Sequence, residues 1–190
     1  MLKIFVTNLG KYNEGELVGK WVDLEDYGEW DDFEESAELA SIGIGAPRWD
    51  GTVYEEWFVT DIDCDIPWVS YEEYPGTELF DEWCGSASLW ADLDDGQKDV
   101  LYAYDGHDGV SDLSDAEDVL RRYRDGEIVL HEGCDKEDVV MQWYDQGVIF
   151  GGLDDDTREE MRGFIKWEYV VDEYGQELSE TGSDVLEVRW

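Results

Sequence analysis

The alternation of apolar and polar residues predicts β-structure at the start of the chain. Residues 3–8 are β-prone, residues 9–15 are rich in Gly and Asn, and residues 16–24 resume the strand pattern. This order predicts two strands joined by a turn. A third strand is expected over residues 53–66, and its second half, residues 61–66, alternates strictly between carboxylates and apolar side chains. That half therefore has one charged face and one apolar face.

A helical period replaces the strand pattern in residues 29–40. The apolar residues Trp30, Phe33, Ala37 and Ala40 recur at helical spacing, and acidic residues fill most positions between them. The sequence therefore predicts one amphipathic helix whose outer face is acidic.

Helical patterns dominate after the turn signals at Pro67 and residues 75–76. Helices are predicted over residues 77–84 and 97–104, because apolar residues recur three and four positions apart in both. The polar loop 105–112 ends this segment. We expect these residues to form a small acidic helical domain.

The rest of the chain predicts three more helices. Ser114 and Glu117 have the spacing of a capping box, which predicts a helix that ends near Tyr123. Two further helices are expected after Asp135 and after residues 154–156, where carboxylates stand at capping positions. The inward positions of the last helix are Met161, Phe164 and Ile165.

Strands are expected on either side of these last two helices, over residues 127–131 and 184–190, the second with alternating character. The sequence therefore predicts an α+β protein. The changes in pattern divide it into three successive small domains. These are a β-rich domain with an acidic helix (1–74), a central acidic helical domain (75–112) and an α+β domain (113–190).

The composition is strongly acidic, with 51 Asp and Glu against 13 Lys and Arg in 190 residues, and a net charge of −38. The 10 Trp, 11 Tyr and 6 Phe nevertheless distinguish the chain from a disordered acidic tail. Because no apolar run approaches the roughly 18 residues of a membrane span, we expect a cytoplasmic protein with no membrane partner. A surface of this charge should bind a basic partner and not nucleic acid.

The charge is distributed unevenly along the chain. Residues 21–97 contain 23 acidic residues and the single base Arg48, whereas residues 98–190 contain 26 acidic and 9 basic residues. Self-repulsion on this scale destabilises a fold, so we expect the acidic block to have a function. A halophilic surface would distribute its acidic residues evenly, and this one does not.

A polyanion mimic would explain the acidic block. Duplex DNA carries one charge per roughly 1.7 Å, so 38 charges correspond to about 65 Å of helix, or about 19 base pairs. A compact chain of this length would be only about 40 Å across. To imitate DNA the protein must therefore be elongated, which agrees with successive small domains.

Other chemistry is less well supported. Asp61, Asp63, Asp65 and Glu72 fit positions 1, 3, 5 and 12 of a calcium loop, but Ile66 replaces the glycine of position 6. An acidic calcium-binding module therefore remains an alternative, as does an enzyme with an acidic surface. With 51 carboxylates, any pair of them carries little catalytic information.

Few residues suit a metal or a nucleophile. His131 and Cys134 would supply half a zinc site, and the other histidine is His107. Cys64, Cys84 and Cys134 are odd in number and irregularly spaced, so we expect free thiols. We expect no catalytic residue, metal or cofactor.

The stretch NLGKYNEGELVG, residues 8–19, closely resembles the signature of the ArdA antirestriction proteins. The resemblance extends over residues 4–21 and, more loosely, to later segments. The chain departs from the family in a longer insertion at residues 41–52 and in an extended final strand. The looser matches are residues 54–57, 77–79, 128–131, 134–135, 164–165 and 174–178.

The resemblance implies an elongated homodimer of three-domain chains that mimics bent B-form DNA. Such proteins, carried by phages, plasmids or conjugative elements, occupy the DNA groove of type I restriction-modification enzymes in the host cytoplasm. The family dimerises through its last domain. Our candidates for that contact are the apolar residues Ile128, Val129, Leu130, Val148, Ile149 and Phe150.

The acidic block and the start of the next helix supply the carboxylates that we expect to imitate phosphates. They lie on the predicted helices, on the charged strand face and in the loops between them. These residues are Asp31, Asp32, Glu34, Glu35, Glu38, Asp61, Asp63, Asp65, Glu72, Glu73, Glu78, Asp81, Glu82, Asp92, Asp94, Asp95, Asp112, Asp115 and Asp118.

Overall fold

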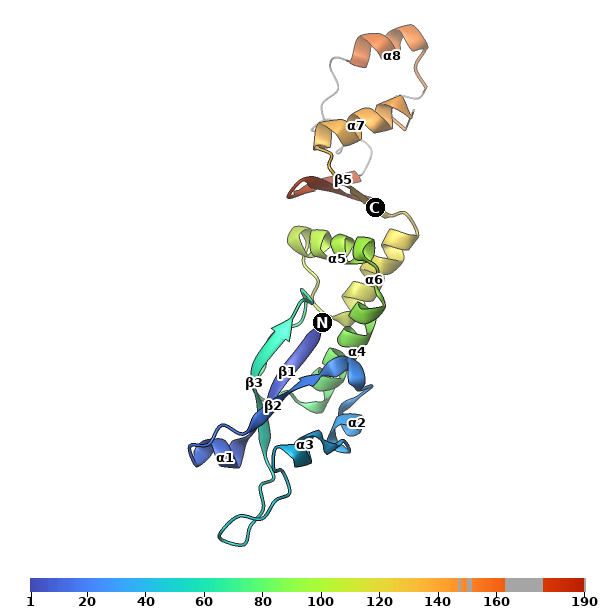
Figure 1. The fold of residues 1–190 in the computed structure, drawn as a ribbon. Coiled ribbons are helices and arrows are strands. Elements are labelled where there is room, and N and C mark those ends of the chain that lie inside the picture. Colours follow the sequence, from blue (N-terminus) through green and yellow to red (C-terminus); the bar gives the residue numbers. More distant parts are fainter. Residues whose placement is uncertain (147, 150–151, 163–175, 190) are drawn as a thin grey trace. The chain divides into compact units, whose positions relative to one another are not determined.

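The computed structural model describes residues 1–146, 148–149, 152–162 and 176–189. The protein is α+β, with two three-stranded antiparallel sheets (Figure 1). It divides into two compact units. The N-terminal unit contains residues 1–94 and 111–113, and the C-terminal unit contains residues 95–110 and 114–190. The three predicted domains and the elongated shape stay predictions.

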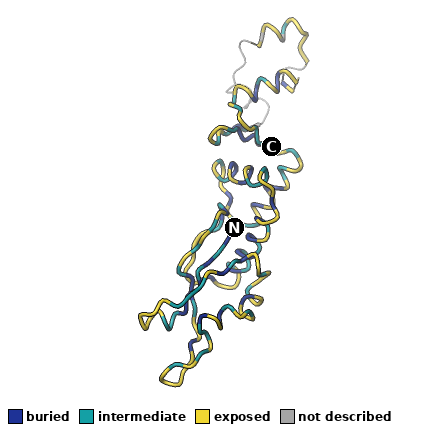
Figure 2. The backbone as a smooth tube through the Cα atoms, in the orientation of Figure 1, coloured by how far each residue is buried: buried dark blue, intermediate teal, exposed yellow. Residues whose placement is uncertain are grey.

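The N-terminal sheet is built around its first strand. β1 (Leu2–Asn8) is the central strand and pairs antiparallel with β2 (Gly19–Asp23) on one side and β3 (Trp57–Cys64) on the other. Leu2, Ile4 and Val6 are buried and Phe5 is half-buried, as expected for a central strand, and Figure 2 colours the backbone by this burial. The predicted pair of strands at the start is confirmed. The turn between them contains the short helix α1 (Leu9–Asn13).

The single acidic helix predicted over residues 29–40 is wrong. Two short helices, α2 (Trp30–Glu34) and α3 (Ala37–Ser41), take its place. Ser36 separates them, because its hydroxyl donates to the Phe33 carbonyl at 2.6 Å and also accepts from the second amide of α3. A serine that satisfies backbone groups in this way favours a helix start over a helix interior.

The break changes which residues face the core. Phe33 is fully buried and Trp30 is half-buried, as predicted. Ala37 and Ala40 are exposed, however, and Leu39 is buried in their place. The helical spacing therefore holds within α2 and is reset at α3.

An aromatic cluster forms much of the core of the N-terminal unit. The long helix α4 (Thr77–Asp92) packs beside η1 (Leu24–Asp26) and contributes Phe80. The ring of Phe80 lies 5.0 Å from that of Phe33, and Trp57 lies 5.3 Å from Phe33. Contacts of this kind stabilise a core beyond the area they bury. The sequence predicted only the first half of α4, over residues 77–84.

The third strand is shorter than residues 53–66, and the alternation of its second half is confirmed. Asp61, Asp63 and Asp65 are exposed, whereas the residues between and after them are half-buried or buried. Before the strand, a bridge between Pro47 and Val53 closes a loop. Residues 48–52, the second part of the predicted insertion at 41–52, lie within this loop.

The C-terminal sheet has the order β4-β6-β5. The predicted strands correspond to β4 (Ile128–His131) and β6 (Asp184–Arg189), and β5 (Gln176–Thr181) was not predicted. The central strand β6 does not alternate, because four consecutive residues are buried. Helix α5 (Asp95–His107) contacts all three strands, and α7 (Lys136–Asp145) contacts β5. Burial on both faces explains why apolar residues stand on both faces of β6, Val185 on one and Leu186 and Val188 on the other.

Two further helices complete the C-terminal unit. α6 (Leu113–Arg124) begins one residue before Ser114, so the predicted capping box at Ser114 is wrong and this residue lies within the first turn. The predicted cap at Asp135 is confirmed, since its carboxylate accepts from the Asp138 amide at 2.8 Å. α8 (Asp155–Met161) follows. The predicted core positions Phe164 and Ile165 lie outside the described residues.

In the part of the chain that the structure describes, no helix combines the length and apolar character that crossing a bilayer requires.

Candidate partner-binding surface

The 19 carboxylates predicted to bind a partner lie at the surface. Fifteen of them are exposed and none is buried. The half-buried members are Glu38, Asp81, Glu82 and Asp112. Exposed carboxylates keep much of their hydration.

Helix α2 carries the densest group of these carboxylates. Phe33 anchors the helix in the core, which leaves Asp31, Asp32, Glu34 and Glu35 exposed around it. The first two lie in the first turn, where the helix dipole stabilises negative charge. Four exposed carboxylates within five residues form an acidic surface that we call the α2 cluster.

Several of the predicted carboxylates also have a local structural role. Asp81 accepts a hydrogen bond from the Trp30 amide at 2.6 Å and so fixes the start of α2 against α4. Glu38 forms an ion pair with Lys20. Asp118 accepts from Arg121 at 2.7 Å within α6. These three carboxylates are less available to a partner than those of the α2 cluster.

The ion pairs of the acidic block reach outside it. Asp23 pairs with Lys3 at 3.0 Å and Asp65 pairs with the N-terminal amine at 3.3 Å. Arg48, the one base of residues 21–97, pairs with Glu14 at 2.7 Å. The base within the block therefore compensates a carboxylate that lies outside it.

The signature residues fix a turn, as the sequence suggested. Asn8 is buried, caps α1 by accepting from the Lys11 amide at 2.9 Å, and donates to the Ile42 carbonyl at 3.2 Å. A Cβ at Gly10 would lie 2.5 Å from the Tyr54 ring, so only glycine fits there. Gly15 has a φ of +88°, which favours glycine.

The same turn holds the loop closed by Pro47 and Val53, which contains part of the predicted insertion. Lys11 and Arg48 both lie 5.0 Å from the centre of the Tyr54 ring, and the Tyr54 hydroxyl donates to Glu14 at 2.7 Å. The hydrogen bond from Tyr54, together with Arg48 and Lys11, holds the pKa of Glu14 below its usual value. Arg48 therefore has a structural role, which explains a lone base in an acidic block.

The calcium-loop template does not form a loop. Asp61 and Asp63 belong to the extended strand β3, and Glu72 follows in irregular chain. A calcium loop must bring such ligands around one point. Among the residues described here, no group of three or more His, Cys, Asp or Glu side chains is arranged to hold a metal ion.

The three cysteines are free thiols. Burial raises the pKa of Cys84 to about 12, and the nearby Asp81 and Asp32 add to the shift. Burial also raises the pKa of Cys64. Because the thiolate is the nucleophile, neither of these two thiols is suited to nucleophilic chemistry near neutral pH.

One carboxylate has no exposed surface among the described residues. Glu187, on β6, bonds to His131 at 2.8 Å and to Arg189 at 2.5 Å. Burial alone would raise the pKa of Glu187, but the hydrogen bonds from these two partners outweigh it and the pKa is lowered. The sequence signal that we missed is an acidic residue between Leu186 and Val188 of an apolar strand.

The residues proposed for a dimer contact differ in exposure. Ile128 and Ile149 are fully buried within their own chain, so their side chains offer no surface to a second copy. Val129 and Leu130 are half-buried, and Val148 is 50% exposed. The other candidate, Phe150, lies outside the described residues. The dimer itself stays a prediction.

The family comparison agrees with the signature. The family model described as antirestriction protein (ArdA) matches residues 4–186. A search of curated proteins gave no match. The match covers nearly all of the 190 residues, including the acidic block and most of both sheets. The chain therefore belongs to the ArdA family of antirestriction proteins.

Proposed function

We propose that this protein inhibits type I restriction-modification enzymes by occupying their DNA-binding groove as a mimic of duplex DNA. The observation that carries the proposal is the acidic block of residues 21–97. It has a net charge of −22, and its predicted partner-binding carboxylates are exposed or half-buried. A groove that binds DNA presents many Lys and Arg side chains, for which this surface is the electrostatic complement.

The mechanism is occupancy, with no chemical step. Each exposed carboxylate contributes a small attraction to the basic groove, and the sum over many contacts provides affinity. Local ion pairs engage Asp23, Glu38 and Asp65 of the acidic block, whereas the four carboxylates of the α2 cluster form no ion pair among the described residues. Binding therefore depends on the density of bare carboxylates and not on one residue.

The proposal includes a homodimer. Two copies carry 76 net negative charges, which at the charge spacing of DNA need about 130 Å of path. Each chain would then consist of successive small domains and would act in the cytoplasm of a cell that carries a mobile element. Small-angle scattering tests this part, because a compact monomer would contradict it.

The decisive test of where the partner binds uses two variants that lose the same number of charges in different places. The first removes the α2 cluster by Asp31→Asn, Asp32→Asn, Glu34→Gln and Glu35→Gln. The second removes four exposed carboxylates of α8 by Asp155→Asn, Asp156→Asn, Glu159→Gln and Glu160→Gln. Circular dichroism confirms that both are folded, and cleavage of plasmid DNA by a type I enzyme measures inhibition.

The α2 variant should need about tenfold more protein for half-inhibition, whereas the α8 variant should inhibit nearly as well as the natural chain. An equal loss of inhibition in both variants would mean that net charge alone matters, and it would contradict partner binding at the α2 cluster. Unchanged inhibition by the α2 variant would contradict it as well.

A further inference from the structure

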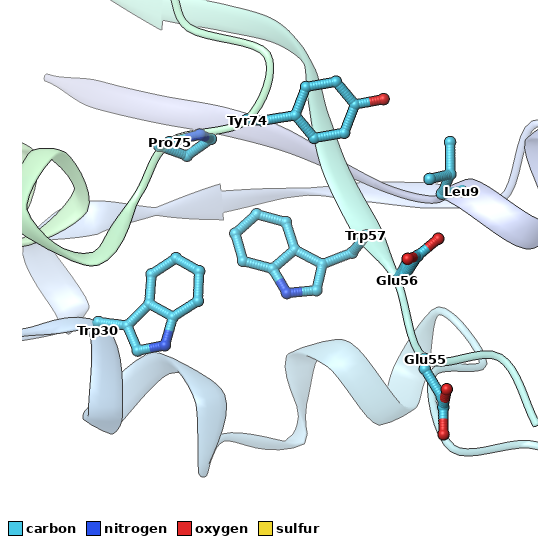
Figure 3. Close-up of a pocket in the computed structure, with 7 residues that line it drawn as sticks. All are labelled: Leu9, Trp30, Glu55, Glu56, Trp57, Tyr74 and Pro75. Carbon is cyan, nitrogen blue, oxygen red and sulfur yellow. The ribbon is translucent and has the colours of Figure 1, made fainter.

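A small aromatic hollow opens in the N-terminal unit beside the acidic surface. Figure 3 shows the indoles of Trp30 and Trp57 next to each other, with Tyr74 along one side and Glu55 and Glu56 at one end. The hollow has a volume of about 270 Å³. Pockets for drug-sized ligands span roughly 300–1,000 Å³, so this one suits a single side chain better than a cofactor.

The fold holds the walls of this hollow in place. Trp30 starts α2 and Trp57 starts β3, and their rings lie 5.4 Å apart at an angle of 30°. Phe80 supports Trp30 from the core, with ring centres 5.2 Å apart. Tyr74 stacks on Phe58 at 5.8 Å. The walls are therefore ordered before a ligand arrives, which lowers the entropic cost of binding.

The chemistry of the walls selects a cation. The faces of indole and phenol rings attract positive charge, and indole attracts it most strongly. Glu55 and Glu56 are exposed, and no base among the described residues forms an ion pair with either. Arginine combines both contacts, because its planar guanidinium stacks on aromatic rings and binds carboxylates through paired hydrogen bonds.

We propose that this hollow receives an arginine side chain from the basic groove of the restriction enzyme. The inference rests on the proposed function and adds a stacking contact to its ionic ones. Stacking on an indole responds less to salt than an exposed ion pair does. The hollow therefore gives the inhibitor a fixed point of contact within an otherwise diffuse surface.

The test uses N-acetyl-arginine methylamide as the probe and the neutral isostere N-acetyl-citrulline methylamide as its control. The indole N–H signals of Trp30 and Trp57 in a nitrogen-15 correlation spectrum report binding. The arginine probe should shift both signals saturably, and the citrulline probe should not. Equal shifts by both probes, or shifts that do not saturate, would overturn the inference.

Matched variants distinguish binding of the probe in the hollow from general attraction to negative charge. Glu55→Gln with Glu56→Gln removes two carboxylates at the hollow, and Glu34→Gln with Glu35→Gln removes two exposed carboxylates of the α2 cluster. The first pair should weaken probe binding about fivefold and the second less than twofold. Tyr74→Leu, which changes no charge, should also weaken it. Equal weakening by the two pairs would overturn the inference.

The same variants in the plasmid cleavage assay distinguish this inference from the proposed function. If the hollow is used, the Glu55 and Glu56 variant inhibits more weakly than the Glu34 and Glu35 variant. If the two inhibit equally, the arginine contact is wrong while DNA mimicry stands. If the natural chain fails to inhibit the enzyme, the proposed function itself is wrong.

Discussion

Two regions of this protein, the α2 cluster in the N-terminal unit and helix α6 in the C-terminal unit, accommodate acidic residues in different ways. In the N-terminal unit, carboxylates such as those of the α2 cluster are exposed over an aromatic core that includes Phe33 and Phe80. In the C-terminal unit, Arg121 binds Asp118 at 2.7 Å and approaches Asp125 at 3.3 Å. Both units form ion pairs, but the four carboxylates of the α2 cluster pair with no base among the described residues, whereas Arg121 pairs with carboxylates close to it in the chain.

The difference separates two uses of a carboxylate. A paired carboxylate organises its own chain, as Glu187 does with His131 and Arg189. A bare one costs stability through repulsion and is retained where a partner supplies the opposite charge. We therefore expect the N-terminal unit to provide most of the partner binding, and each prediction below tests one side of this comparison.

The largest effect is expected in the aromatic core that supports the bare carboxylates. Phe33 is fully buried, and the ring centres of Phe80 and Trp57 lie within 5.3 Å of its own. Phe33→Ala should lower the free energy of unfolding by about 4 kcal/mol, because it leaves a cavity. Urea unfolding measures it, with exposed Val53→Ala as the control. A loss below about 1 kcal/mol would mean that the core does not depend on this cluster.

The next effect concerns the buried carboxylate of the C-terminal unit. Glu187→Ala should cost about 3 kcal/mol, since it leaves His131 and Arg189 without their shared partner. Urea unfolding again provides the measurement. An unchanged free energy of unfolding would show that the three side chains do not act together.

The pH dependence of Glu187 has a defined sign. Its pKa is lowered in the folded protein, so its stabilisation is complete above the unfolded pKa of roughly 4.3. The stabilisation is lost as the pH falls through the lower folded value. The stability difference between the natural chain and Glu187→Gln should therefore shrink below pH about 4. A difference that grew on acidification would contradict this assignment.

The contrast between Ser36 and Phe33 shows what the sequence could predict. The apolar spacing that identified Phe33 as core is a local property, and it is confirmed. The break at Ser36 was missed, because a serine within an acidic run does not reveal that its hydroxyl will bind the Phe33 carbonyl. Strand β5 was missed for a similar reason, since its partner β6 is what makes it a strand.

The exposed carboxylates of the candidate surface could be predicted from the sequence, whereas the aromatic hollow could not. The exposure of Asp31 or Asp63 follows from charge alone, and all 19 predicted carboxylates avoid the core. The hollow required the fold, because Trp30, Trp57 and Tyr74 come from separate segments and only tertiary packing unites them. The pairing of Glu187 with His131 could not be predicted either, because the two residues are far apart in the sequence.

A smaller effect is expected from salt. Screening relieves repulsion among the carboxylates of residues 21–97, so raising salt from low to moderate concentration should increase stability. The expected gain is about 1 kcal/mol, or roughly 4 °C in the thermal midpoint. Calorimetry at several salt concentrations measures it. A flat midpoint would show that self-repulsion is already compensated.

The smallest effects are expected from single neutralisations. Replacing any one of Asp31, Glu35, Asp63, Glu78 or Asp95 by its amide should change half-inhibition of restriction by about twofold or less, because one exposed carboxylate contributes little. Dose–response curves for the five variants provide the comparison. If one of them abolished inhibition with its fold intact, a localised site would replace the diffuse surface.

Competition with DNA tests the central claim most directly. A fluorescent duplex is bound to a type I restriction enzyme, and this protein is added while fluorescence anisotropy reports the bound fraction. Occupancy of the groove predicts complete displacement of the duplex, with an apparent affinity that falls in proportion as more duplex is added. A stable complex that contains the enzyme, the duplex and this protein together would contradict the account.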